Sequence, residues 1–230
     1  MYVSVADVRA EGITVADASD ERIEAIIRLA ERYIERVTGR FFEPRPQSLT
    51  IDGPSGRVLR LGHPIIRIDV VAVDSSSATT PVPIDPSSYR VYNRHLTQGL
   101  LIPDDRDDPR IELVRGGDAS VGLDAIWPCG VQNVRVAGVF GYTDPDGSPM
   151  GVTPMLIRHT TKLLVLRELP LMADLDGRED AQRRWRLTSE RTRDQAYTLG
   201  ALASQGAFTG DREIDLILAV YTRPADLGAA

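Results

Sequence analysis

The clearest periodicity in the chain lies between Ser19 and Gly39, where apolar residues return every three or four positions. This spacing places them on one face of a helix, formed by Ile23, Ile26, Ile27, Ala30, Tyr33, Ile34 and Val37. Ser19 suits the N-cap and Gly39 suits a left-handed C-terminal cap. Asp20 and Glu21 would lie in the positive first turn. The pattern predicts one long amphipathic helix, with a shorter helix near residues 5–10 before it.

From Pro44 onward the apolar period changes to two, with glycine or proline every ten or so residues. Alternation of this kind predicts a meander of antiparallel strands. The candidate strands are residues 47–51, 57–61, 65–73, 88–93, 99–103, 110–114 and 131–142. In the last of them four large residues share one face: Val134, Val136, Phe140 and Tyr142. Gly138 lies among them, and we expect a β-bulge there.

Helical character returns at Thr153, where Pro154 fits the first helical position. Apolar residues surround much of this helix, which we expect at the centre of a bundle: Met155, Leu156, Ile157, Leu163, Leu164, Val165, Leu166 and Leu169. Eleven of the nineteen residues from Asp176 to Asp194 are charged, so this stretch can contribute little core. A last helix is predicted at residues 211–222.

Helices therefore flank a β-rich stretch, and this order predicts an α+β fold. We expect a small α-helical bundle with an inserted antiparallel β-rich domain and a C-terminal arm that ends in a helix. The expected division is residues 1–44 for the N-terminal helices, 45–148 for the β-rich insertion, 149–175 for the central bundle helix, and 176–230 for the charged arm.

The last helix has two apolar faces at about 100° per residue. One face carries Ile214, Ile217, Leu218 and Tyr221, and the nearly opposite face carries Leu216 and Val220. A terminal helix of this kind either lies inside its own bundle or covers one neighbour with each face. Both arrangements fit the sequence.

Composition changes this picture by excluding some classes of protein. A net charge of −6 among 230 residues argues against tight binding to DNA phosphates. Cys129 is the sole cysteine, so neither an intramolecular disulfide nor a cysteine zinc site is expected. The start lacks a basic leader, and the longest apolar run is broken by Arg167 and Glu168. We expect a protein that is neither secreted nor embedded in a membrane.

Candidate chemistry is sparse. His63, His95 and His159 lie far apart, and no zinc-protease, nucleophile-elbow, Walker or dinucleotide motif occurs. The run from Asp104 to Asp108 could hold a hard cation through its carboxylates, but a solvated turn is the simpler interpretation. Acidic neighbours nearly cancel the basic cluster around Trp185. We therefore expect no catalytic residue, metal or cofactor, and a metal-dependent hydrolase remains the minor alternative.

Several segments, taken in order, resemble the head-tail connector, or adaptor, proteins of long-tailed phages, prophages and gene transfer agents. These segments are YVSVADVRAEGIT, DERIEAIIRLAERYIERVTGRFF, GHPIIRIDVVAV, VRVAGVFGY, LTSERTRDQAYTLG and FTGDREIDLILAVYTRP. Together they span nearly the whole chain, which has a larger β region than the short members of the family. The resemblance implies a structural ring, a dodecamer, beneath the portal of a DNA-filled capsid.

In that family the C-terminal segment docks on the portal. Carried onto this chain, the arm is roughly residues 187–223, and its anchors for the portal or a neighbouring subunit are Tyr197, Phe208, Ile214, Leu216, Ile217, Leu218, Val220 and Tyr221. The other implied partners are a neck, stopper or tail-terminator protein and the double-stranded DNA that passes through the ring. Candidates for the acidic channel wall are Asp104, Asp105, Asp107 and Asp108. The resemblance implies that the protein is located in the virion neck, and in the host cytoplasm during assembly. Another neck or tail-completion protein, without portal contact, is the main alternative.

Overall fold

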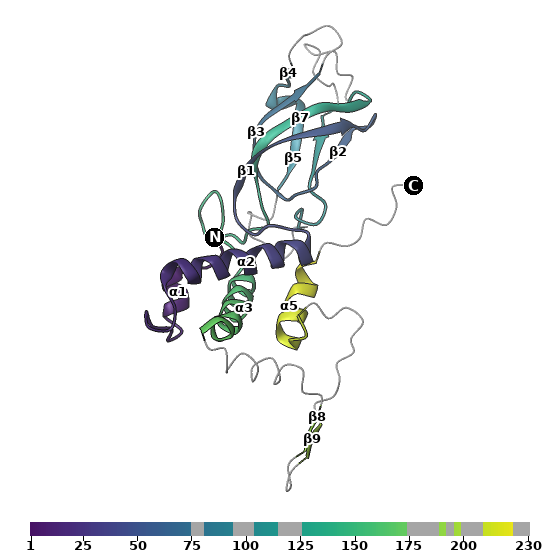
Figure 1. Cartoon of the computed structure of the whole chain (residues 1–230). Coiled ribbons are helices and arrows are strands. Elements are labelled where there is room, and N and C mark those ends of the chain that lie inside the picture. The colour runs from purple at the N-terminus through teal and green to yellow at the C-terminus, as the bar shows by residue number, and fades with distance from the viewer. Residues whose placement is uncertain are drawn as a thin grey trace. The chain divides into compact units, whose positions relative to one another are not determined.

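The computed structural model describes residues 1–74, 81–93, 104–114, 126–173, 189–191, 196–198 and 209–222. The chain divides into two compact units (Figure 1). Met1–Arg40 and Met155–Ala230 form the helical unit, and Phe41–Pro154 forms the β unit. Helices and antiparallel sheets are both present, which confirms the predicted α+β class.

The helical unit begins with two helices. The first, α1, is Val5–Arg9, and the second, α2, is Asp20–Thr38. Ser19 caps the start of α2, and Gly39 ends it in the left-handed region with a φ of 67°. Glycine adopts this conformation without the steric cost of a Cβ atom. The helix predicted between Ser19 and Gly39 is therefore confirmed, together with both of its caps.

Two further helices pack against α2. The helix α3, Met155–Ala173, begins one residue after Pro154, and α5, Arg212–Tyr221, contacts both α2 and α3. Buried apolar side chains from these helices and from α1 form the core of the unit: Val8, Ile23, Ile26, Ile27, Ile34, Ile157, Leu164, Val165, Leu169, Ile214 and Leu218. No helix within the described part of the chain is long and apolar enough to span a bilayer.

A short hairpin lies in the region that the sequence predicts simply as a charged arm. Its strands are β8, Ser189–Arg191, and β9, Ala196–Thr198, and they pair antiparallel. Strands of three residues among charged neighbours show no clear apolar alternation. The hairpin therefore had no signal in the pattern of hydrophobic positions.

The β unit contains two antiparallel sheets. The four-stranded sheet has the order β1 (Arg45–Gly53), β7 (Gly130–Phe140), β3 (Ile65–Val73) and β4 (Val82–Pro83). The three-stranded sheet has the order β2 (Val58–Arg60), β6 (Arg110–Leu113) and β5 (Tyr89–Tyr92), and a 3₁₀ turn at Pro86–Ser88 precedes β5. Six of the seven candidate strands are found, and the candidate at residues 99–103 lies outside the described residues.

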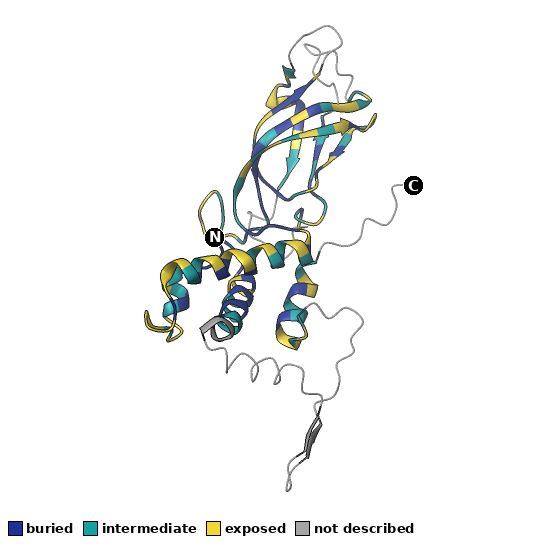
Figure 2. Cartoon of the chain, in the orientation of Figure 1, coloured by how far each residue is buried: buried dark blue, intermediate teal, exposed yellow. Residues whose placement is uncertain are grey.

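One core serves both sheets of the β unit, and buried residues are coloured dark blue along the ribbon in Figure 2. Its members are Phe41, Leu59, Leu61, Ile65, Val71, Val73, Ile84, Tyr89, Ile111, Leu113, Trp127, Val134, Val136 and Phe140. The indole N–H of Trp127 donates to the backbone carbonyl of Arg57 at 3.0 Å, which satisfies the polar atom of this buried ring. The alternation predicted for β7 is thus confirmed at three of its four positions, since Tyr142 follows the end of the strand.

The bulge predicted at Gly138 is wrongly placed. The register between β3 and β7 is irregular at two points of β3, between Ile65 and Arg67 and between Ile68 and Val70. A Cβ atom at Gly138 would collide with the backbone carbonyl oxygen of Arg67. Glycine is therefore required in β7 because the bulged partner strand comes so close.

Candidate docking surface of the terminal helix

Side chains at the start of α5 fix where this helix begins. The carboxylate of Asp211 accepts hydrogen bonds from the backbone N–H groups of Glu213 at 2.9 Å and Ile214 at 3.4 Å. Asp215 reaches back and accepts from the backbone N–H of Thr209 at 2.7 Å and from its hydroxyl at 2.8 Å. A cap of this kind contributes about 1 kcal/mol to helix stability. These hydrogen bonds fix the conformation of residues 209–211, which lead into α5.

The inner face of α5 belongs to its own unit. Ile214 and Leu218 are fully buried, and Ile217 and Tyr221 are half-buried. Because α5 packs on α2 and α3, the predicted stripe of four residues serves the bundle core. It leaves little of these side chains free for another protein.

The outer face of α5 is apolar and exposed. Leu216 retains 59% of its accessible surface and Val220 retains 77%. Four residues apart, they lie on neighbouring turns of one helix face. Single exposed apolar residues are common, but a pair on one face of a terminal helix is a candidate contact surface.

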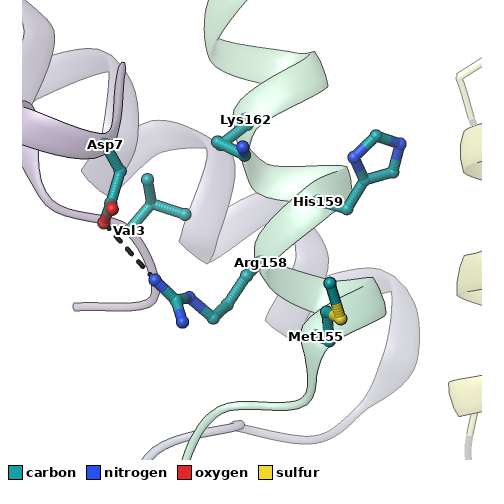
Figure 3. A pocket seen from close by; sticks show the side chains of 6 residues that line it. All are labelled: Val3, Asp7, Met155, Arg158, His159 and Lys162. Atoms are coloured by element: carbon teal, nitrogen blue, oxygen red, sulfur yellow. Dashed lines mark ion pairs between the residues drawn. The ribbon is translucent and has the colours of Figure 1, made fainter. Parts of the chain in front are cut away.

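A pocket of about 240 Å³ lies in the same unit, lined by Val3, Asp7, Met155, Arg158, His159 and Lys162 (Figure 3). Arg158 pairs with Asp7 at 3.6 Å, and Lys162 pairs with Glu11. His159 lies 3.1 Å from Glu213 of α5. Each cationic or imidazole group thus meets an acidic partner from α1, from the segment after α1 or from α5, so the cluster links several parts of the helical unit.

The candidate histidines and the cysteine lie in different surroundings. His159 is half-exposed and has no nucleophile in the pocket, His63 stacks on Phe41 at 4.7 Å, and Cys129 is exposed. His95 and the basic cluster around Trp185 lie outside the described residues. Among the residues that are described, no three His, Cys, Asp or Glu side chains form a group that could hold a metal. Nothing in this part of the chain favours a hydrolase.

The acidic loop is less negative than its sequence indicates. Asp104 pairs with Arg106 at 2.6 Å, and Asp108 pairs with Arg110 at 2.7 Å and with Arg60. Asp105 is 3% exposed, so the prediction of an exposed carboxylate is wrong at this position.

The exposed carboxylates of this loop are therefore Asp107 and Asp104, with Asp108 half-exposed. The two arginines that pair with Asp108 lie in strands, Arg60 in β2 and Arg110 in β6.

Two of the predicted anchors fall elsewhere. Tyr197 lies in β9 opposite Glu190 of β8, and Phe208 lies outside the described residues. The structure also contains a surface that the sequence reasoning missed, a groove between α2 and α3. The available signal was Leu29, an apolar residue of α2 that does not belong to the predicted buried stripe.

Comparison with known proteins gives structural neighbours alone. No family model matches the chain, and no curated protein matches it. A solved chain described as "Neck of empty GTA particle computed with C6 symmetry" is similar, with a TM-score of 0.53 and 17% identity. A second, described as "Virion of native gene transfer agent (GTA) particle", has a TM-score of 0.52 and 17% identity. Each alignment covers 99% of this chain and 92% of the other, so the likeness concerns the whole fold.

Proposed function

We propose that the protein is a structural component of the neck of a phage-like particle, and specifically a head-tail adaptor. In this role copies form a ring beneath the portal, extend the DNA channel and connect the capsid to the next neck or tail component. The observation that carries the proposal is the likeness in fold to a gene transfer agent neck chain over 99% of this chain. A helical unit whose sequence is interrupted by a β unit also matches the architecture that the resemblance to head-tail adaptors implies.

The proposed ring has twelve copies, a number compatible with the six-fold symmetry named for the similar neck. In the virion the ring would lie at the head-tail interface, after assembly in the host cytoplasm. The partner on its far side would be a neck, stopper or tail-terminator protein.

Portal contact is assigned to the arm, residues 187–223. Ile214 and Leu218 are committed to the bundle core, so the outer face of α5 is the accessible face of this helix. Leu216 and Val220 would therefore meet an apolar surface of the portal. Both side chains are well placed for this because burial by a partner would remove their exposed area from water.

We propose that the net negative charge of the chain lets DNA pass through the ring without binding to it. Twelve copies with a net charge of −6 each would present a surface that repels phosphates. Asp107 and Asp104 are the exposed acidic residues of the loop that could contribute. Asp107→Lys, which leaves the pair between Asp104 and Arg106 in place, should slow DNA exit from particles, and unchanged ejection kinetics would remove this part of the proposal.

Co-sedimentation with purified portal rings tests the adaptor assignment. The full chain should sediment with the rings, and a chain ending after Gly206 should stay in the supernatant. Leu216→Asp with Val220→Asp should also abolish binding, whereas Val131→Asp, at an exposed apolar residue of the β unit, should not. Binding by the shortened chain would contradict the arm assignment. Failure of the full chain to bind would favour the alternative, a neck or tail-completion protein without portal contact.

A further inference from the structure

The groove between α2 and α3 is apolar and open. It has a volume of about 220 Å³, and its lining is Ile26, Leu29, Ala30, Tyr33, Leu164, Arg167 and Glu168. Leu29 is 61% exposed, although α2 is otherwise amphipathic with its apolar stripe buried. Covering Leu29 and the groove with another apolar group would remove apolar surface from water, which is favourable.

Arginines border this groove on the α2 side. Arg28, Arg32 and Arg36 are exposed and follow one another at four-residue spacing, next to Leu29 and Tyr33. Arg28 pairs with Glu24 at 3.4 Å. Arg32 and Arg36 form no ion pair or hydrogen bond with any residue that the structure describes. The rim is therefore positive in a chain whose net charge is −6.

On the α3 side the rim carries one charge of each sign. Arg167 lies 3.6 Å from Glu168, so the two side chains largely offset each other. The positive charge of the groove thus comes from α2. A partner for this surface needs a small apolar group with acidic residues around it.

The same chain carries such a group in the loop between α1 and α2. Val15 is 76% exposed in this loop, Asp17 is exposed two residues later, and Glu21 is exposed in the first turn of α2. Hydrogen bonds from the hydroxyl and backbone N–H of Thr14 lower the pKa of Asp17, so its carboxylate stays charged at neutral pH.

Two further acidic residues within residues 11–21 already have cationic partners. Glu11 pairs with Lys162, and Asp20 pairs with Arg9. Asp17 and Glu21 therefore account for the net negative charge around Val15.

We propose that copies of this chain associate head to tail, with the acidic segment at residues 11–21 of one copy, the α1–α2 loop and the start of α2, seated in the basic-rimmed groove of the next. Val15 would fill the groove against Leu29, while Asp17 and Glu21 face Arg32 and Arg36. Two different, complementary patches on one chain make a heterologous contact, which closes into a ring when the rotation per copy divides a full turn. The inference rests on the proposed ring and names the surfaces that build it.

Charge reversal tests the pairing. Sedimentation velocity over a range of protein concentrations and salt should show self-association of the full chain that weakens as salt rises. Arg32→Glu and Glu21→Arg should each weaken association at least about tenfold, because each places like charges together. The double variant should recover most of the loss. Arg212→Glu is the matched control, an exposed arginine of α5 outside both patches, and should associate as the unchanged chain does.

Cross-linking tests the geometry. In a Cys129→Ser background, a chain with both Val15→Cys and Leu29→Cys should form a ladder of dimers, trimers and larger species on oxidation. A two-fold contact would stop at dimers and overturn the head-to-tail arrangement. A chain that stays monomeric at every concentration reached would also overturn the arrangement. So would equal association by Arg32→Glu and Arg212→Glu.

The outcomes separate this inference from the adaptor assignment. A chain that sediments with portal rings but forms no ladder keeps the adaptor function and removes the proposed contact. A chain that forms the ladder but does not bind portal rings keeps the proposed contact and removes the adaptor function.

Discussion

Arg106 connects three parts of the β unit through one side chain. Its guanidinium is largely buried and donates to both carboxylate oxygens of Asp104, to the carbonyl oxygen of Thr143 at 3.0 Å and to Asp144 at 2.8 Å. It also stacks on the ring of Tyr142 at 4.2 Å. Removing such a group leaves the backbone carbonyl of the buried Thr143 and two partly exposed carboxylates without this donor.

We expect Arg106→Ala to lower the free energy of unfolding of the β unit by about 2 kcal/mol. Arg67→Ala is the control, because Arg67 pairs with Asp69 at the surface and its loss should change stability by less than about 0.5 kcal/mol. Urea unfolding followed by tryptophan fluorescence measures both, in a Trp185→Phe background that leaves the buried Trp127 as the reporter. Equal losses in the two variants would mean that the contacts of Arg106 are not stabilising.

Asp7 couples the stability of the first helix to pH. Its carboxylate accepts hydrogen bonds from the backbone N–H of Ser4 at 2.9 Å and from the Ser4 hydroxyl at 2.8 Å, and it lies 3.6 Å from Arg158. The backbone hydrogen bond from Ser4 is the largest cause that lowers the pKa of Asp7. A carboxyl whose pKa is lower in the folded chain stabilises the fold above its unfolded pKa, about 3.9, and loses that effect as the pH falls through the folded pKa.

Asp7→Asn should therefore lower the melting temperature at pH 7, and the difference from the unchanged chain should shrink below about pH 4. Thermal unfolding followed by circular dichroism at a series of pH values gives both numbers. A difference that stays constant down to pH 2 would show that the charge of Asp7 is not what stabilises the fold.

Local signals were sufficient for the helices and insufficient for the pairing of strands. Ser19, Gly39 and Asp211 cap helix ends through contacts a few residues away, so the sequence alone predicts α2 and α5. The bulge was wrongly assigned to Gly138 because a bulge depends on which strands pair, and β3 lies far from β7 in the chain. The acidic loop was misjudged for the same reason, since Arg60 reaches it from a distant strand.

The two apolar faces of α5 depend both on local signals and on contacts with distant segments. Helical periodicity gives two apolar faces, but which of them the bundle buries depends on the packing of α2 and α3. The structure assigns Ile214 and Leu218 to the core and leaves Leu216 and Val220 exposed.

This assignment predicts a clear difference between two leucines of one helix. Leu218→Ala should create a cavity and destabilise the packing of α5 by about 2–5 kcal/mol, whereas Leu216→Ala should change it by less than about 0.5 kcal/mol. Hydrogen exchange at the backbone amides of residues 212–221 reports the effect on this helix directly. Faster exchange in Leu216→Ala than in Leu218→Ala would reverse the assignment of the two faces.

At the scale of the whole molecule, the β unit has the architecture expected of an inserted domain. Arg45, at the start of β1, pairs with Phe140, at the end of β7, and the backbone N–H of Tyr142 donates to the carbonyl of Phe41 at 2.9 Å. The start of the unit therefore lies beside residues 140–142, twelve residues before its end at Pro154. Adjacent ends allow a domain to interrupt another chain segment without threading through it.

A fragment containing residues 41–154 should therefore fold by itself. Its core cluster draws every member from within the unit, including Phe41 near one end and Phe140 near the other. Cooperative urea unfolding and a near-ultraviolet dichroism signal from Trp127 would demonstrate a packed interior. A matched fragment that starts at Arg45 lacks Phe41 and its hydrogen bond to Tyr142, so it should unfold at lower urea. If the longer fragment unfolds without a cooperative transition, the β unit depends on the helical unit for its fold.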